Sequence, residues 1–265
     1  MIRKILLIVY MFLTLWVAAP LPASDRFDDL AKAIRSDDPA LVEELLDEDA
    51  SLVNIRQKGR SAVLEALFAT KKGEGFKDAK ANVVLQRILA RKPKLDLHET
   101  AALGKTADLE KLLRPELVRK PNDFGWTPLH MAAFAGNVEA VQLLLDRGAD
   151  VHVRAGTKFR NNPLQVALLT GQYEVAKLLI DRGADVLSRQ AQGFTPMHEA
   201  ALLGRRDIAE LLLERGAEIN SRSDDGRTPL SEAMRGGHQE VAEWLRSKGG
   251  VAGAVGGDAD KPPIE

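Results

Sequence analysis

One stretch of sequence recurs four times in the second half of this 265-residue chain, and this repetition limits the folds that the chain can adopt. From one copy to the next, the shared proline lies 35, 33 and 33 residues further along, and two glycines keep the same intervals. Three landmarks that hold one phase indicate a repeated structural unit. The four copies are GWTPLHMAAFAGNVEAVQLLLDRGADV from Gly125, NNPLQVALLTGQYEVAKLLIDRGADV from Asn161, GFTPMHEAALLGRRDIAELLLERGAEI from Gly193 and GRTPLSEAMRGGHQEVAEWLRSKGG from Gly226.

Each copy predicts two short helices. Thr127 is placed to cap the first helix, and the proline after it suits the first turn, where no amide hydrogen is needed. Ala132 and Ala133 leave room for neighbouring helices to approach closely. The segment from Val138 to Leu145 carries an apolar stripe at helical spacing, and Gly148 supplies the left-handed residue that ends the second helix. One such unit cannot bury its apolar face alone, so the copies must stack.

With its period of 33 and its T-P-L-H start, the repeat resembles the ankyrin-repeat family. The resemblance implies an all-α solenoid of about seven helix-turn-helix repeats, joined by β-hairpin loops that project at about a right angle. Upstream copies are degenerate but visible, as in the run from Leu97 to Gly104, and the second copy contains an inserted loop from Lys71 to Lys80. The expected repeats cover residues 24–57, 58–94, 95–121, 122–156, 157–189, 190–222 and 223–249, and the Gly- and Pro-containing tail 250–265 is predicted to be disordered.

The first 23 residues form a separate segment. Arg3 and Lys4 precede an uncharged run from Ile5 to Ala19, and a proline-containing stretch ends at Ala23. This order predicts a secretory signal peptide that is cleaved after Ala23. The alternative is an uncleaved membrane anchor, but the uncharged run is shorter than the roughly 20 residues that span a bilayer. An exported chain without cysteine fits a bacterial envelope compartment, so we expect a periplasmic protein.

Charge and motifs argue against several functions. Loss of Arg3 and Lys4 leaves 35 basic against 38 acidic residues, which does not favour a nucleic acid or an anionic membrane as partner. Neither the phosphate-loop pattern near Gly104 nor the zinc-protease pattern after each His-Glu pair is complete. We therefore expect no enzyme activity, no cofactor and no metal site. The resemblance assigns a structural hydrogen-bonding role to the motif histidines, which are His98, His130 and His198.

Ankyrin-like repeats vary at the hairpin tips and at the exposed edge of the first helix, where they face partners. Aromatic residues at such places are frequent interface hot spots. The alternative is that these rings only pack on the neighbouring hairpin. The candidate partner-binding residues at these places are Phe124, Trp126, Phe134, Phe159, Arg160, Phe194 and Arg227.

A second candidate set is basic. Arg154, Arg189 and Arg222 each end the extended stretch of a repeat, so stacking should align them in a ladder at the base of the hairpins. Such a ladder could complement an acidic partner surface, although each arginine could instead pair with a nearby aspartate. The sequence therefore predicts a monomeric protein-interaction module that binds or inhibits an envelope protein. The alternatives are a general scaffold in envelope stress protection and an enzyme with an unrecognised site.

Overall fold

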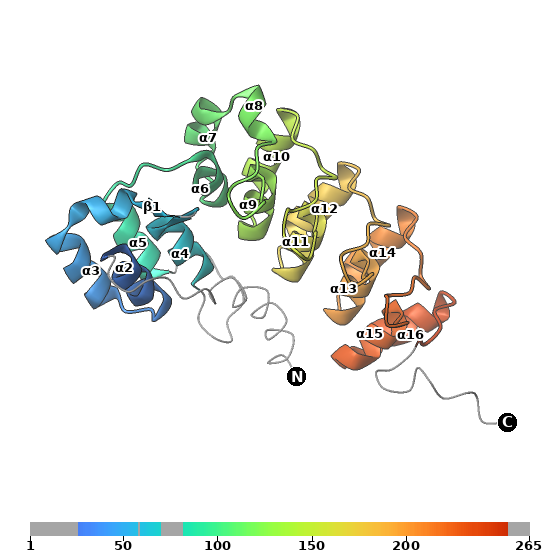
Figure 1. Ribbon diagram of the computed structural model, residues 1–265. Coiled ribbons are helices and arrows are strands. Elements are labelled where there is room, and N and C mark those ends of the chain that lie inside the picture. The colour runs from blue at the N-terminus through green and yellow to red at the C-terminus, as the bar shows by residue number, and fades with distance from the viewer. Residues whose placement is uncertain (1–25, 58, 70–81, 254–265) are drawn as a thin grey trace.

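The computed structural model describes residues 26–57, 59–69 and 82–253, and within these ranges it shows seven helix pairs stacked in a curved array (Figure 1). We number the pairs as repeats 1 to 7. This arrangement confirms the predicted all-α solenoid. The pairs are α2 (Arg26–Arg35) with α3 (Pro39–Glu48), α4 (Ala62–Phe68) with α5 (Val83–Ala90), α6 (Leu97–Ala102) with α7 (Thr106–Leu112), α9 (Pro128–Ala135) with α10 (Val138–Asp146), α11 (Pro163–Leu169) with α12 (Tyr173–Asp181), α13 (Pro196–Leu202) with α14 (Arg206–Glu214), and α15 (Pro229–Gly236) with α16 (Gln239–Ser247). A short helix, α8 (Pro115–Val118), follows α7, and a 3-10 segment, η1 (Ala50–Asn54), follows α3.

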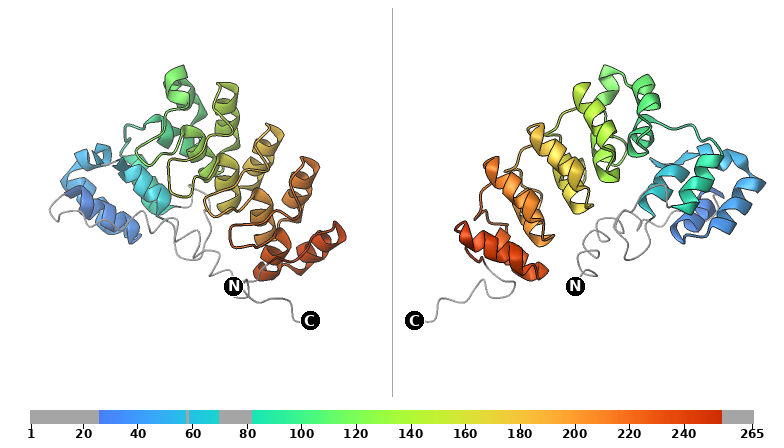
Figure 2. Two further views of the ribbon diagram at one scale, coloured as in Figure 1. Left: turned by 45° about the vertical axis from the view of Figure 1, so that its right-hand side comes forward. Right: turned by 180° about the vertical axis from the view of Figure 1, so that it is seen from behind.

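The two helices of a repeat occupy different layers. In the middle of the array, α9, α11 and α13 lie on the inside of the curve, and α10, α12 and α14 lie on the outside (Figures 1 and 2). We call the first helix of each repeat its inner helix and the second its outer helix. The inner helices therefore form a concave face that runs along the solenoid.

The predicted caps are present. Thr127 is the N-cap of α9, Pro128 occupies the first turn, and the capping box is completed by His130 at the third helical position. Thr195 and Thr228 cap α13 and α15 in the same way. These side chains occupy amide groups that the first helical turn would otherwise leave unpaired. After α10, Gly148 has a φ of +86°, which is the left-handed conformation expected for a helix stop.

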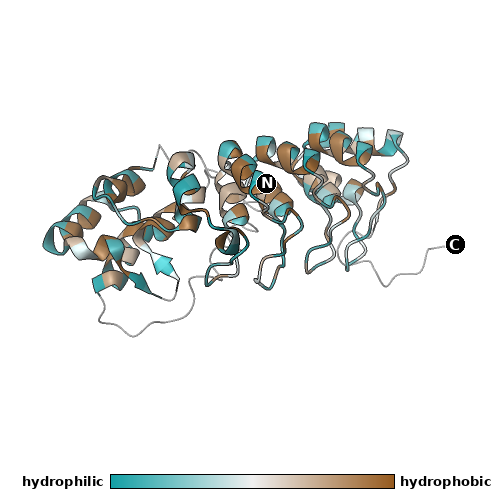
Figure 3. Ribbon diagram, turned by 90° about the horizontal axis from the view of Figure 1, so that it is seen from above, coloured by the Kyte–Doolittle hydropathy of each residue, from teal (hydrophilic) through white to brown (hydrophobic). Residues whose placement is uncertain are grey.

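The connections between repeats project from one side of the helical layers, as the view from above shows (Figure 3). We call them fingers, and each precedes the inner helix of its repeat. Among the described residues, paired strands occur only in the finger of repeat 2, where β1 (Arg56–Gln57) pairs antiparallel with β2 (Arg60–Ser61). Fingers 4 to 7 differ from the predicted β-hairpins because no strands pair within them. One backbone hydrogen bond joins the two arms of each finger, as from Asn122 N to Trp126 O at 2.8 Å, and a second closes the turn, as from Gly125 N to Asn122 O at 2.8 Å.

Neighbouring fingers are also tied to each other. The amide of Gly156 donates to the carbonyl of Gly125 at 2.8 Å, and a Cβ added at Gly125 would lie 2.6 Å from the Gly156 Cα. Glycine is therefore required for this close approach. Further along, Ala191 donates to Phe159 O and Asp224 donates to Gln192 O. The backbone of fingers 4 to 7 thus forms one continuous hydrogen-bonded row.

Two hydrophobic clusters make up the core. One lies mostly in repeats 1 and 2, and it also contains Ala102 and Met131 from the next two inner helices. The other extends from repeat 3 to repeat 7. The predicted close helix approach is confirmed, because Ala132 and Ala133 are completely buried between neighbouring helices. Repeat 3 therefore lies at the junction between the two clusters.

The C-terminal end of the solenoid differs from the prediction. Residues 250–253 are ordered, because Asn220 accepts a hydrogen bond from Val251 N, and the Thr228 hydroxyl bonds Val251 O and Gly253 N. The prediction of a disordered tail over 250–265 is therefore wrong for its first four residues. The rest of that tail lies outside the described residues. The predicted signal peptide and the Lys71 to Lys80 insertion lie outside them as well. Within the described ranges, no helix is both long and apolar enough to span a membrane.

Candidate protein-binding surface

The aromatic candidates of repeat 4 belong to a cluster that reaches back two repeats. The Trp126 ring meets Phe134 edge-on at 5.4 Å and Phe68 at 6.1 Å, and Phe68 lies 5.0 Å from Phe134, all between ring centroids. Phe134 is only 4% exposed, so it packs within the fold and offers almost no surface to a partner. Trp126 and Phe124 are half-buried against the core of repeats 1 and 2.

Phe194 is also covered by its own repeat stack. It is 8% exposed, its ring meets His198 edge-on at 5.3 Å, and the Arg227 guanidinium lies 4.6 Å above it. Arg227 in turn bonds Asp225 at 2.6 Å and Glu232 at 3.0 Å. For Phe194 and Arg227, the packing alternative therefore accounts for the position of both side chains.

The finger of repeat 5 is the most open of the candidate segments. It is two residues longer than the fingers of repeats 6 and 7, and it carries exposed Lys158 and Arg160 on either side of half-buried Phe159. The Lys158 ammonium lies 4.9 Å from the centre of the Phe159 ring. Arg160 has a φ of +54°, an unusual value for a residue with a side chain, and this turns the finger at its tip.

The predicted arginine ladder is present at the base of the fingers. Arg154 Nη1 donates to the carbonyl of Arg189 at 2.5 Å, and Arg189 Nη1 donates to the carbonyl of Arg222 at 2.9 Å. Arg189 also pairs with Asp224 at 3.2 Å. Arg154 and Arg222 have no carboxylate partner among the described residues, and all three arginines are exposed. The alternative of pairing with an aspartate therefore holds for Arg189 alone.

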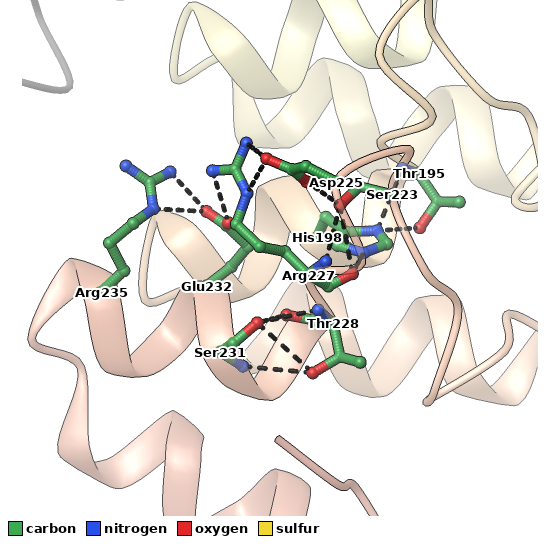
Figure 4. A network of polar contacts seen from close by, with 9 residues as sticks. All are labelled: Thr195, His198, Ser223, Asp225, Arg227, Thr228, Ser231, Glu232 and Arg235. Carbon is green, nitrogen blue, oxygen red and sulfur yellow. Dashed lines mark hydrogen bonds and ion pairs between the residues drawn. The ribbon is translucent and has the colours of Figure 1, made fainter. Parts of the chain in front are cut away.

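The histidine prediction is confirmed by the hydrogen bonds. His130 Nδ1 lies 2.9 Å from the Thr127 hydroxyl, and its Nε2 lies 3.1 Å from the carbonyl of Asn161 in the next finger. His198 repeats this arrangement toward Arg227 O (Figure 4). Burial lowers the pKa of His130 from 6.5 to about 4, so the ring is neutral and Nε2 donates to the carbonyl. His130 and His198 thus join α9 and α13 to the fingers that follow them.

Sequence reasoning missed a row of buried glutamates on the inner helices. Glu65, Glu199 and Glu232 each stand four residues after an N-cap, and all are buried. Figure 4 shows Arg227 and Arg235 converging on Glu232. The signal was available, because the offset from Ser61, Thr195 and Thr228 is constant.

A second missed feature is a ladder of ion pairs between outer helices. Arg182 at the end of α12 pairs with Asp146 of α10 at 2.9 Å, and Arg215 after α14 pairs with Asp181 of α12 at 2.8 Å. Arg147 makes the corresponding contact with Glu110. The arginines of the outer ladder are thus paired within the fold, whereas Arg154 and Arg222 of the finger ladder bond only carbonyls among the described residues. No group of metal-binding side chains occurs within the described ranges.

Curated proteins match only parts of this chain. Human "DNA-binding protein RFXANK" is 43% identical over 63 residues, which are 23% of this chain and 24% of that protein. The rice "Probable E3 ubiquitin-protein ligase XBOS32" is 54% identical over 48 residues, 18% of this chain and 10% of that protein. The human "Transient receptor potential cation channel subfamily A member 1" is 39% identical over 61 residues, which are 22% of this chain and 6% of that protein. The chain thus spans about a quarter or less of these relatives, whose names describe unrelated activities.

The family model described as ankyrin repeats (3 copies) matches residues 97–190, 154–223 and 188–253, which together cover more than half of the chain. Those residues hold the capped inner helices, the histidine bonds and the linked fingers described above. Ankyrin repeats are protein–protein interaction modules, and the unrelated activities of the matched relatives fit a shared binding frame. The chain belongs to the ankyrin-repeat family.

Proposed function

We propose that this protein is a non-catalytic binding module of the bacterial cell envelope, which holds or inhibits one partner protein through its fingers and concave face. The observation that carries the proposal is the exposed ladder of Arg154, Arg189 and Arg222. Its guanidinium groups are positioned by backbone carbonyls, and at Arg154 and Arg222 no carboxylate of the described residues neutralises them. Positive charge held in this way can attract an acidic protein surface.

The finger backbone supports the same proposal. The inter-finger hydrogen bonds hold the finger row in one conformation before a partner arrives. Little conformational entropy is then lost on binding, which favours affinity. The half-buried rings of Phe124, Trp126 and Phe159 and the exposed side chain of Arg160 add contact surface beside the ladder.

The envelope location rests on the sequence of residues 1–23, and we propose a monomeric periplasmic protein after cleavage at Ala23. The mature chain has a small negative net charge, so an acidic partner would be attracted by the local ladder and not by the whole molecule. The second candidate, a general scaffold in envelope stress protection, differs in binding several proteins through one face.

The test is affinity capture of the tagged mature protein from envelope extracts, followed by titration against the captured protein. Changing Arg154, Arg189 and Arg222 to Glu should slow association at low salt and reduce its salt dependence. The control changes Lys105, Lys111 and Lys248 to Glu, which alters the net charge equally but away from the fingers. Equal effects from both variants would refute the ladder as the binding surface.

A further inference from the structure

Three inner helices place a glutamate at the same buried position, and within the part of the chain that the structure describes two of these glutamates have side-chain partners. Glu65 accepts from Arg35 at 3.0 Å and from Arg60 at 2.5 Å. Glu232 accepts from Arg227 at 3.0 Å and also from Arg235 (Figure 4). Two guanidinium groups thus offset the cost of burying each of these carboxylates.

Glu199 of α13 is the exception. It is 3% exposed, and neither carboxylate oxygen has a hydrogen-bond partner among the described residues. The two partners of Glu232 are Arg227, directly before the N-cap of α15, and Arg235, in the last turn of that helix. The equivalent positions of repeat 6 hold Phe194 and Leu202, which cannot pair with a carboxylate. Because no charge offsets its desolvation, burial raises the pKa of Glu199 well above its ordinary value.

The fold itself does not require a carboxyl group at this position. Repeat 4 has Met131 and repeat 5 has Val166 four residues after the N-cap, and both are buried apolar side chains. An unpaired buried carboxyl destabilises a protein relative to such residues. Natural proteins accept such a loss of stability mainly at functional positions.

We propose that Glu199 binds an arginine side chain of the partner protein, which completes in trans the pair that Glu65 and Glu232 complete within the chain. The inference rests on the proposed function and names the chemistry of one partner contact. Every cation that pairs at this position in the chain is a guanidinium, whose planar donors suit the two oxygens of a carboxylate.

Access to the position is short. Arg235 reaches Glu232 from the concave side while its own side chain remains 36% exposed. In repeat 6 half-buried Leu202 occupies the place of Arg235, so a partner arginine would approach Glu199 beside this side chain. The partner surface would then combine acidic groups opposite the finger ladder with one arginine opposite α13.

A displayed library of random peptides tests this contact, because the ligand probed is the peptide itself. Peptides would be selected on the wild-type mature protein, on Glu199→Gln, on Leu202→Arg, and on Glu243→Gln, which changes an exposed carboxylate of α16. Circular dichroism would confirm the fold of each variant. We expect wild type and Glu243→Gln to enrich arginine at one peptide position, with affinity for the selected peptides falling about tenfold in Glu199→Gln. Leu202→Arg supplies the guanidinium within the chain, so it should abolish the enrichment as well.

The outcomes separate this inference from the proposed function. Peptides that lack a preferred arginine, or that bind Glu199→Gln as well as wild type, overturn the role of Glu199. If those same peptides lose affinity for the variant with Arg154, Arg189 and Arg222 changed to Glu, the finger surface still binds and only the inference fails. If no variant of either set changes peptide binding, the concave face is not the binding surface and both proposals fail.

Discussion

Acid should destabilise this protein through the buried histidine of repeat 4, and the size of the effect follows from one pKa. The pKa of His130 is lowered from 6.5 to about 4 because its completely buried ring is held neutral between Thr127 and the carbonyl of Asn161. A group with a depressed folded-state pKa of this kind binds a proton more readily in the unfolded chain. Its contribution to stability is therefore complete at neutral pH and is lost as pH falls from 6.5 toward 4.

The loss can be calculated from the two pKa values. Between pH 7.5 and pH 5 the unfolded chain takes up the proton that folded His130 refuses, which lowers the free energy of unfolding by about 2 kcal/mol, and by about 3 kcal/mol at pH 4. The pKa values of His98 and His198 are lowered in the same direction by burial, so they add to the effect.

The chain supplies a matched substitution. Repeat 5 has Gln165 in the place of His130, where it completes the same capping box with Asn162 and lies 3.4 Å from Ser188 O. His130→Gln should therefore fold. In urea unfolding, its free energy of unfolding should fall between pH 7.5 and pH 5 by about 2 kcal/mol less than that of wild type. His152→Gln, at an exposed position, is the control. An equal loss in His130→Gln and wild type would refute this assignment.

Three further predictions concern two buried glutamates and the N-terminus. Glu232→Gln should lower the free energy of unfolding by about 2 kcal/mol, because Arg227 and Arg235 lose their shared carboxylate. Glu199→Gln should instead raise the free energy of unfolding at neutral pH, because the pKa of the buried carboxyl is raised well above 4.5. This gain should shrink as pH falls toward 4.5, and urea unfolding of both variants would contradict the assignment if Glu199→Gln were the less stable of the two at neutral pH. Finally, N-terminal sequencing of the protein from the envelope fraction should begin at Ser24, whereas an intact Met1 in membranes would contradict cleavage.

Much of the fold follows from local sequence, and what escaped prediction depends on contacts between repeats. Thr127 and Gly148 act within one turn of chain, so their roles as cap and helix stop were predictable. The arginine ladder was predictable because stacking brings equal positions together. The burial of Phe134 was not, because it depends on Phe68, which lies two repeats earlier in the chain. The unpaired state of Glu199 was missed because it becomes evident only beside the arginine pairs of the equivalent glutamates.

Trp126 lies where the two hydrophobic clusters meet, and this position predicts which repeats its removal will destabilise. It stands in repeat 4, within the range of the larger cluster, yet it packs against the cluster of repeats 1 and 2 and meets Phe68 across repeat 3. Since stability in stacked repeats is approximately a sum of units and their interfaces, the loss of one interface should act locally. Trp126→Leu removes a half-buried ring, which should cost about 2 kcal/mol at this junction.

Hydrogen exchange can locate that loss along the chain. In wild type, residues 62–69 and 83–90 should already exchange faster than residues 128–235, because the later repeats share the larger cluster and the linked fingers. Trp126→Leu should widen this difference. Trp244→Leu, which removes the buried tryptophan of the last outer helix, should accelerate exchange near residues 229–247 and leave repeats 1 and 2 unchanged. If both variants accelerate exchange uniformly, the solenoid opens as one unit and the boundary at repeat 3 has no energetic meaning.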